Sequence, residues 1–378
     1  MGVSILALET SCDDTCAAVL DARGVLRANV ISSQEAHARF GGVVPEIASR
    51  HHLELVNLIV EQALARAQVT LDEVELVAAT QGPGLVGALL VGLSTAKALA
   101  AARELPFAPV DHLQGHVAAN FLAPEPPPDD EPPPDGAGGA AHAGASVVQG
   151  AAASASAGAF EPPFVCLIAS GGHTLLARVT EHDGYEVLGR TLDDAAGEAF
   201  DKGARMLGLG YPGGAALERL AADGDAQAFT FPGSPGERGR AGRGERRQRF
   251  EHSLDFSFAG VKTALLYTLR ELGEQTARER AADLAASYQA AIVERLVARA
   301  SQALAHTGLT RLAVGGGVAA NGLLRERLRA LDASVHVPAR ALCTDNAAMI
   351  ASAARFRAPL AYPSYLTLDA YATGEARR

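Results

Sequence analysis

The sequence predicts an α/β protein built from two related halves. Each half opens with two short apolar segments on either side of a polar turn, at residues 3–20 and again at 164–179. Each half later has a buried apolar segment, a glycine-rich turn and a helical stretch, around 76–102 and 311–331. Short apolar runs bounded by turn residues are typical of strands, and the recurrence of one order of elements indicates an internal duplication.

Turn residues set the order of elements in the first half. A helix is expected after Pro45, since the fixed φ of proline suits a first helical turn. A long helix is expected after the turn Gly82-Pro83-Gly84, and another after Asp111. The strands expected between these signals are 3–8, 15–20, 25–31, 76–80 and 107–110.

The second half repeats this order with an added helical block. Its expected strands are 164–169, 174–179 and 311–314, and its helical stretches are about 193–222, 258–306 and 319–331.

Two segments of biased composition interrupt the chain. Residues 123–163 are mainly Ala, Pro, Gly, Ser and acid, and we expect a disordered insertion there. Residues 233–249 form an Arg-rich loop that is either solvated or able to contact an RNA backbone.

These signals give a domain organisation. We expect an N-terminal lobe at 1–122, the insertion at 123–163, a C-terminal lobe at 164–354, and a tail at 355–378 that can pack back on the N-terminal lobe. The length of 378 residues and the 48% hydrophobic content are enough for two cores.

Composition also narrows the class of protein. Lys and Arg number 33 against 43 Asp and Glu, and the formal charge of −10 argues against a dedicated nucleic-acid binder. No apolar run reaches the ~18–20 residues of a membrane span, and no signal-peptide pattern is present, so we expect a cytoplasmic protein. The few cysteines fit buried thiols in a reducing compartment; they are Cys12, Cys16, Cys166 and Cys343.

Three glycine-rich turns are candidates for holding phosphate, because glycine lets backbone N–H groups approach an anion closely. Residues 82–87 match GxGxxG, but Ala88 stands where a Walker A loop has lysine. The turn at 170–173 and the triple glycine at 315–317 are the others. Packing of a helix against a sheet is the alternative explanation for 82–87, and a plain hairpin turn is the alternative for 170–173. Ordinary packing seldom needs three successive glycines, so 315–317 favours a ligand more strongly. Asn321, just after the third turn, is a candidate for ribose or base binding, or an ordinary surface residue.

His112 and His116 are four residues apart, so on a helix both imidazoles lie on one face and suit one divalent ion. Leu113 stands where the zincin pattern HExxH has its general base, which disfavours peptide hydrolysis of that type. Asp345 is a candidate third ligand, although an aspartate before a helix is often only a cap.

Two groups of acids are further candidates. Asp13 and Asp14 lie in the first polar turn, where a carboxylate can accept a proton or simply be solvated. Asp194, Glu198 and Asp201 are spaced to share one helical face, which requires solvent, cations or ligand hydroxyls to offset their repulsion.

Together these segments resemble the tRNA N6-adenosine threonylcarbamoyltransferase family, formerly labelled O-sialoglycoprotein endopeptidase. The matching blocks run in order over nearly the whole chain outside the two biased segments. They are ETSCDDT (9–15), GGVVPEIASRHH (41–52), GPGLVGALLVG (82–92), DHLQGH (111–116), SGGHT (170–174), DDAAGEAFDK (193–202), YPGG (211–214), DFSFAGVKT (255–263), GGGVAAN (315–321) and TDNAAMIA (344–351).

The resemblance implies the two-lobed, internally duplicated fold of actin-like ATPases, sugar kinases and heat-shock ATPases (ASKHA), with the site in the cleft between lobes. It implies transfer of the threonylcarbamoyl group from threonylcarbamoyl-AMP to N6 of adenosine 37, giving t6A and AMP, in tRNAs that read codons beginning with A. If the chain is bacterial, the implied partners besides tRNA are a paralogous subunit of the same fold (TsaB) and a small ATPase (TsaE), with no membrane.

The resemblance also assigns residues. The metal ligands would be His112, His116 and Asp345, holding one Fe²⁺ or Zn²⁺ per subunit. For the catalytic residues our own hypothesis is that Asp13 or Asp14 accepts the proton of the attacking amine. The residues implied to contact the adenylate are Ile168, Ala169, Ser170, Gly171, Gly172, Asp201, Gly214 and Asn321.

The chain departs from the family pattern at Asp14, where many members have glutamate, and at the two long biased segments, 123–163 and 233–249. Three other interpretations stay open. One is a relative with an ATP site but another acceptor, such as a carbamoyltransferase or a sugar kinase. A second is a non-catalytic paralogue, although such paralogues lose the histidine pair that is present here. The third is the endopeptidase of the older label.

Overall fold

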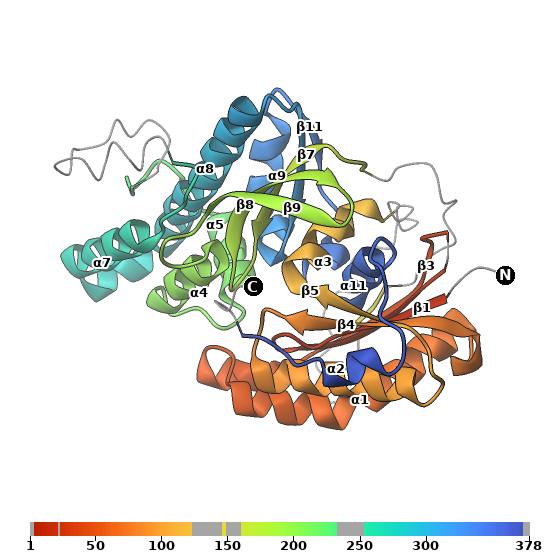
Figure 1. The fold of residues 1–378 in the computed structure, drawn as a ribbon. Coiled ribbons are helices and arrows are strands. Elements are labelled where there is room, and N and C mark those ends of the chain that lie inside the picture. The colour runs from red at the N-terminus through yellow and green to blue at the C-terminus, as the bar shows by residue number, and fades with distance from the viewer. Residues whose placement is uncertain (1–3, 22, 123–145, 149–159, 233–252, 373–378) are drawn as a thin grey trace. The chain divides into compact units, whose positions relative to one another are not determined.

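The computed structural model describes residues 4–21, 23–122, 146–148, 160–232 and 253–372 (Figure 1). The expected Arg-rich loop, and the expected insertion except for 146–148 and 160–163, lie outside these ranges. Contacts divide the chain into two compact units. The first unit is Met1–Glu35, Val43–Phe160 and Asp345–Arg378, and the second is Ala36–Gly42 and Glu161–Thr344. The lobe boundaries expected from the sequence stay a prediction.

A mixed sheet forms the centre of the first unit, with strand order β5-β4-β1-β2-β3-β6. The hairpin β1–β2 is antiparallel, with Glu9 opposite Cys16, and β4 lies parallel to β1 on its other side. Because helices cover both faces, the inner strands are apolar almost throughout rather than alternating. The strands are β1 Ser4–Glu9, β2 Asp14–Leu20, β3 Leu26–Ser33, β4 Val74–Gly82, β5 Phe107–Asp111 and β6 Ser146–Val148.

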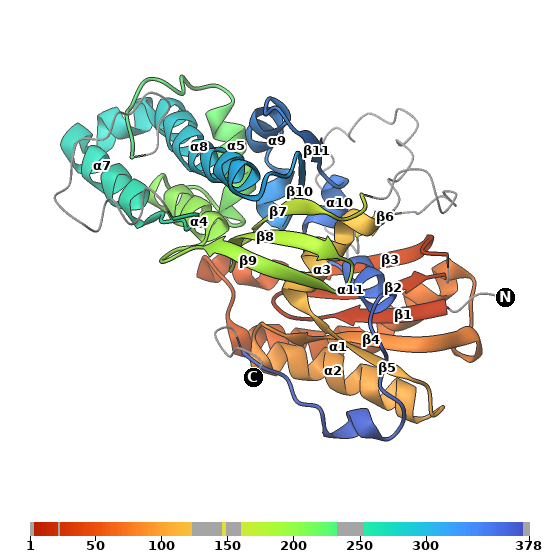
Figure 2. The same cartoon turned by 45° about the horizontal axis from the view of Figure 1, so that its top comes forward.

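Two helical layers enclose this sheet (Figure 2). On one face, α1 (Pro45–Ala67) and α2 (Val86–Ala101) bury a core with side chains such as Leu6, Val19 and Val30. On the other face lie the short helices α3 (His112–Ala118) and α11 (Ala347–Ala354), which contact each other. The expected helix starts after Pro45 and Asp111 are therefore present.

The second unit repeats the central topology of the first. Its sheet has the order β11-β10-β7-β8-β9, in which β7–β8 is an antiparallel hairpin and β10 lies parallel to β7. This order matches β5-β4-β1-β2-β3 of the first sheet strand for strand, so the predicted duplication is confirmed. The strands are β7 Phe164–Ala169, β8 Thr174–Glu181, β9 Gly184–Arg190, β10 Arg311–Gly315 and β11 Ser334–His336.

Helices of the second unit pack around α8, whose Tyr288 is fully buried. The helical stretch expected at 258–306 is divided at Arg280, which leaves the helical region with φ −103° and ψ 16°, and it is also kinked at Gly273, with φ 73° and ψ 165°. The helix expected at 319–331 is shorter, since Asn321 caps a new start after a 3₁₀ turn. The helices are α4 Ala196–Met206, α5 Gly213–Ala221, α7 Ala259–Glu279, α8 Ala281–Thr307, α9 Gly322–Arg329 and α10 Arg340–Cys343.

No helix among the described residues combines the length and the apolar character needed to cross a bilayer.

Candidate metal centre

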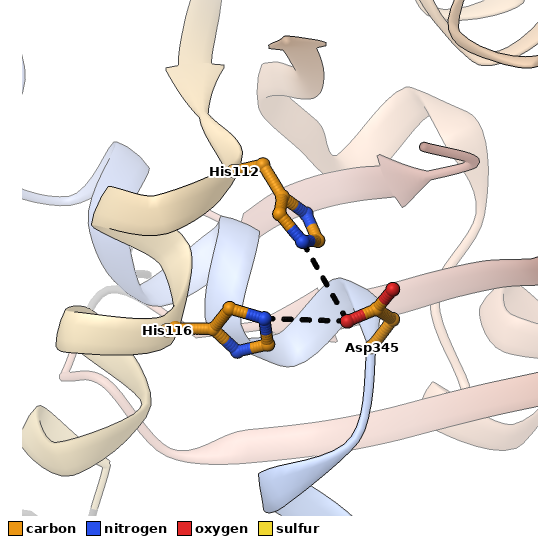
Figure 3. A group of neighbouring side chains, drawn as sticks. All are labelled: His112, His116 and Asp345. Carbon is orange, nitrogen blue, oxygen red and sulfur yellow. Dashed lines mark ion pairs between the residues drawn. The ribbon is translucent and has the colours of Figure 1, made fainter. Parts of the chain in front are cut away.

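His112, His116 and Asp345 come together within the first unit (Figure 3). The Oδ1 atom of Asp345 lies 3.6 Å from Nε2 of His112 and 3.3 Å from Nε2 of His116. One ligand atom from each residue lies within 4.8 Å of the other two. Such a cluster of two imidazoles and a carboxylate has the size and the donor types of a site for one divalent ion.

Local sequence explains why both histidines face Asp345. The chain leaves β5 at Asp111, whose Oδ1 accepts the N–H of Gln114 at 3.0 Å and caps α3. Gly115, between the histidines, lets α11 approach, since a Cβ atom there would lie 2.8 Å from Cδ1 of Ile350. The close approach of α3 and α11 places Asp345, just before α11, beside the histidine pair.

Capping does not account for Asp345. The cap of α11 is its neighbour Asn346, which is fully buried and accepts the N–H of Met349 at 3.0 Å. Asn346, and not Asp345, therefore serves as the helix cap. This leaves metal binding as the explanation for an aspartate at position 345.

Glu9 is a buried carboxylate behind His112 that the sequence did not single out. Its Oε2 atom lies 3.0 Å from Nδ1 of His112 and accepts the hydroxyl of Thr80 at 2.6 Å. Its Oε1 accepts the N–H of Ser11. A carboxylate that orients a metal-ligating histidine through its second nitrogen is common in metal sites. The only signal in the sequence was a single acid at the end of an apolar strand.

The charges of this cluster favour a cation. Burial alone would lower the pKa of His112, but the carboxylates of Asp345 and Glu9 raise that pKa to about 9. Burial would raise the pKa of Glu9, but the charge and the hydrogen bond of His112 lower it. A metal ion binds deprotonated ligands, so it would take the place of the proton that this negative surrounding holds on His112.

His116 gives the sharpest test of whether the residues fit a metal. Its side chain is 0% exposed, and neither ring nitrogen has a hydrogen-bond partner among the described residues. An imidazole buried in this way costs free energy unless something satisfies it. A metal bound to Nε2 satisfies one nitrogen, so the side chains fit a divalent ion.

Asp13, in the turn between β1 and β2, and Asp14, the first residue of β2, lie beside this cluster. His52 of α1 holds the turn, with Nε2 3.0 Å from the carbonyl of Cys12 and Nδ1 2.8 Å from Oγ1 of Thr15. Since a carbonyl only accepts, Nε2 carries the proton and Nδ1 accepts the hydroxyl. Asp14 is half-buried, and burial together with the negative charge of Asp345 raises its pKa to about 7.

Packing accounts for the glycines of the first turn proposed for phosphate. A Cβ atom on Gly82 would lie 2.4 Å from the carbonyl of Tyr371, and one on Gly84 would lie 2.7 Å from that of Ser11. Gly92, further along α2, makes room for Thr10 in the same way. These residues need to be glycine whether or not a ligand is present.

The turn after β7 in the second unit differs. Gly171 and Gly172 are exposed, and a Cβ atom on either would meet nothing within 4 Å. Neither has the positive φ that would itself require glycine. Ile168 and Ala169 are the buried end of β7, and the carbonyl of Ser170 accepts the N–H of Gly197 at the start of α4. The described neighbours thus leave open space over this turn.

Asp201 and Gly214 also lie together, because Oδ1 of Asp201 accepts the N–H groups of Gly213 at 2.9 Å and Gly214 at 3.2 Å. Asn321 is buried rather than at the surface. Its side chain caps α9 at Leu324 and donates to Oε1 of Gln289 at 2.9 Å. A role of these residues in substrate binding stays a prediction.

The expected acidic helical face is wrong for Asp194, which precedes α4 instead of lying on it. Its two oxygens accept the ammonium groups of Lys202 and Lys262, each at 2.7 Å. The neighbouring Asp193 accepts the N–H of Phe258 at the start of α7. These ion pairs and hydrogen bonds join the blocks 193–202 and 255–263, so part of this acidic run is structural.

The fold and the residues above define a duplicated α/β protein of the actin-like ATPase type with a candidate metal centre in its first unit. Two solved structures share the fold. Full-length HypF in its phosphate- and nucleotide-bound form superposes with a TM-score of 0.52 at 13% identity, covering 93% of this chain and 46% of HypF. HypF of T. kodakarensis gives the same TM-score at 14% identity, covering 93% of this chain and 47% of its own.

Sequence comparison identifies the family. The family model described as tRNA N6-adenosine threonylcarbamoyltransferase matches residues 24–134 and 141–352. Relatives bearing that name are 46% identical in Symbiobacterium thermophilum, over 92% of this chain and 90% of the relative, and 43% identical in Pelobacter propionicus, over 99% and 98%. The chain belongs to the tRNA N6-adenosine threonylcarbamoyltransferase family and is a transferase.

Proposed function

We propose that the chain transfers the threonylcarbamoyl group from threonylcarbamoyl-AMP to N6 of adenosine 37, in tRNAs that read codons beginning with A. The products are t6A and AMP. The observation that carries this proposal is the convergence of His112, His116 and Asp345 on one point, in a chain that belongs to this family over nearly its full length. A non-catalytic paralogue would have no need of such a cluster.

The reaction needs positioning and charge stabilisation, because an exocyclic adenine amine is a weak nucleophile. The amine nitrogen bonds to the carbamoyl carbon, the bond from that carbon to the adenylate oxygen breaks, and AMP leaves with the electron pair. His112, His116 and Asp345 would hold one Fe²⁺ or Zn²⁺. When bound, such an ion supplies a Lewis acid and a template for the phosphate and carbonyl oxygens of the adenylate.

Asp13 and Asp14 are the proposed proton acceptors for the attacking amine. A general base works best when its pKa is near the operating pH. In the metal-free protein, burial and then the charge of Asp345 raise the pKa of Asp14 to about 7. The contribution of burial, which is the largest, remains when a metal is bound and supports Asp14 for this role. His52 would act indirectly, by fixing the turn that carries Asp13 and precedes Asp14.

For the adenylate we propose residues of the second unit. The open space over Gly171 and Gly172 supports close approach of a ligand to that backbone. The hydrogen bonds from the Gly213 and Gly214 amides to Asp201 support a preformed turn at the start of α5. The full proposed set is Ile168, Ala169, Ser170, Gly171, Gly172, Asp201, Gly214 and Asn321.

The proposed partners are tRNA and, since the relatives above are bacterial, a paralogous subunit of the same fold and a small ATPase. The proposed location is the cytoplasm, where tRNA modification of this kind takes place.

The test supplies the protein and these partners with tRNA and threonylcarbamoyl-AMP, and measures threonylcarbamoyladenosine by nucleoside analysis. We expect product from wild type and from His306→Ala, a matched histidine change at an exposed position of α8. We expect at least about a hundredfold less from His116→Ala, because a lost metal removes both charge stabilisation and positioning. Equal rates for His116→Ala and wild type would overturn the proposed role of the metal, and absence of product from wild type would overturn the reaction.

A further inference from the structure

The segment after α11 returns along the first unit and is held there by several kinds of contact. Leu360 exchanges backbone hydrogen bonds with Phe107 of β5, at 2.8 and 2.9 Å. The buried ring of Tyr365 packs on Phe107 with 5.3 Å between ring centroids. The ammonium group of Lys97 donates to the carbonyls of Leu366 at 3.1 Å and Leu368 at 2.7 Å. Residues 360–368 are therefore fixed to the sheet and to α2.

The next residues reach the end of β4. The backbone carbonyl of Gln81 accepts the N–H of Tyr371 at 3.2 Å, and its side-chain amide donates to the carbonyl of Asp369 at 2.8 Å. The backbone of Tyr371 passes so close to Gly82 that a side chain at position 82 would collide with it. These two hydrogen bonds with Gln81 fix the position of the Tyr371 phenol.

The hydroxyl of Tyr371 lies 2.6 Å from Oδ2 of Asp111 and 2.8 Å from the carbonyl of Gly82. Both neighbours are acceptors, and the hydroxyl has one proton to give. The shorter distance and the negative charge favour donation to Asp111. The other oxygen of Asp111 accepts the N–H of Gln114, so this carboxylate is held at both oxygens.

Asp111 is the residue directly before His112 and the cap of the helix that carries both histidines. A capping carboxylate that cannot rotate fixes the direction in which the first turn of α3 leaves β5. His112 lies in that turn and His116 one turn later, so their imidazoles depend on this direction.

We infer that Tyr371 is a positioning residue for the metal centre: its hydroxyl locks Asp111, and Asp111 sets the start of the helix that presents His112 and His116. The inference rests on the metal binding in the proposed function. In this inference Tyr371 acts through Asp111, and not directly on the metal or the substrate.

The experiment titrates the metal-free full-length chain with Co²⁺ and Zn²⁺ against a competing chelator. Tyr371→Phe removes one oxygen, and we expect its metal affinity to be about fivefold lower, the equivalent of one hydrogen bond, with a changed visible spectrum of the Co²⁺ form. Tyr362→Phe is the matched control, because Tyr362 is exposed and lies on the same segment. We expect its affinity and spectrum to equal those of wild type.

A double-mutant cycle with Asp111→Asn separates positioning from a merely structural contribution. If Tyr371 acts through Asp111, adding Tyr371→Phe to Asp111→Asn should cost little further affinity. An equal loss in both backgrounds would overturn the inference. So would unchanged affinity in Tyr371→Phe combined with a lower melting temperature of the metal-free protein, which is the signature of a contact that only stabilises the fold. Absence of metal binding by wild type would overturn the metal centre and this role together, whereas loss of transfer with intact binding would concern the proposed reaction alone.

Discussion

Glu9 and His112 are joined by a hydrogen bond in the interior of the first unit, with Oε2 and Nδ1 3.0 Å apart. The Glu9 side chain is fully buried and accepts further hydrogen bonds from Thr80 and Ser11. Because an ionised carboxylate only accepts, Nδ1 of His112 carries a proton, and the proton that a metal would displace is the one on Nε2, which faces Asp345. The hydrogen bond thus selects the nitrogen that can bind a metal.

Replacing Glu9 by glutamine should weaken this selection. The amide keeps the shape but loses the charge, and we expect about tenfold weaker binding of Zn²⁺ or Co²⁺, the usual cost of losing an outer partner of a metal ligand. Competition with a chelator measures the change. Glu75→Gln, at an exposed position on β4, is the control and should bind as wild type does.

Because Glu9 is buried, its variant must be shown to fold. Thr80→Val offers a second route, since it removes only the hydroxyl that donates to Glu9. We expect a smaller loss of affinity in the same direction. Affinities within twofold of wild type in both variants, with normal circular dichroism, would contradict the orienting role of Glu9.

Removing the metal should destabilise the protein. A ligand that binds only the folded state at a hundred times its Kd adds about 2.7 kcal/mol to the free energy of unfolding. We expect a chelator to lower the melting temperature of wild type by several degrees, and excess Zn²⁺ to restore it. His116→Ala should melt at the same temperature with and without the chelator. A chelator effect of equal size on both proteins would place the stabilising ion elsewhere.

The sequence was sufficient for the fold class and for the three candidate ligands. Strands and glycine turns are local patterns, and histidines at i and i+4 already imply one helical face. The partners of those residues were not predictable in the same way. Glu9 and Tyr371 approach α3 only through the pairing of distant segments, and His52 carried no local signal that it would hold the first turn.

The same dependence on distant segments explains why two of the predictions about helices were wrong. Asp194 has the spacing of a helical face, but the helix begins at Ala196, and the partner Lys262 is 68 residues away. The break between α7 and α8 falls at Arg280, where no glycine or proline marks it. Tertiary packing decided these points, and the sequence showed only the local preference.

Asp194 should stabilise the second unit in a pH-dependent manner. Burial would raise its pKa, but the ammonium groups of Lys202 and Lys262 lower it overall. A lowered pKa means that the folded state holds the ionised form, so this stability is present above the ordinary pKa and is lost as the pH falls through the folded value. We expect Asp194→Asn to cost about 2 kcal/mol at neutral pH, since it leaves two ammonium groups without their shared carboxylate.

Urea unfolding at neutral pH and at about pH 3 measures this difference, which should shrink in acid as wild type also loses the charge. Asp223→Asn, an exposed aspartate in the same unit, is the control and should be near wild type at both pH values. A difference that stays constant across the two pH values would show that shape, and not charge, is what Asp194 contributes.

The contribution of Asp14 to the free energy of unfolding should have the opposite pH dependence to that of Asp194. Burial, and then the charge of Asp345, raise its pKa from an ordinary value of 3.8 to about 7, so the folded state holds a proton that the unfolded state has released. Between these two values unfolding releases a proton, and a rise in pH therefore favours unfolding. In the metal-free protein we expect this group to lower the free energy of unfolding as the pH rises from about 4 to about 7, with no further change above that range. Urea unfolding of wild type and Asp14→Asn across that range should show a slope difference of this sign.

Adding a metal is an internal control for the pH dependence that Asp14 gives to the free energy of unfolding. A cation beside Asp345 offsets the negative charge that helps to raise the pKa of Asp14, so the pKa should fall and the slope should flatten when Zn²⁺ is added. Asp72→Asn, an exposed aspartate in the same unit, should keep the slope of wild type with and without metal. If Asp14→Asn and wild type had parallel pH profiles in the metal-free state, Asp14 would be ionised throughout. The argument that its pKa suits a general base at neutral pH would then fail, while the metal ligands would be unaffected.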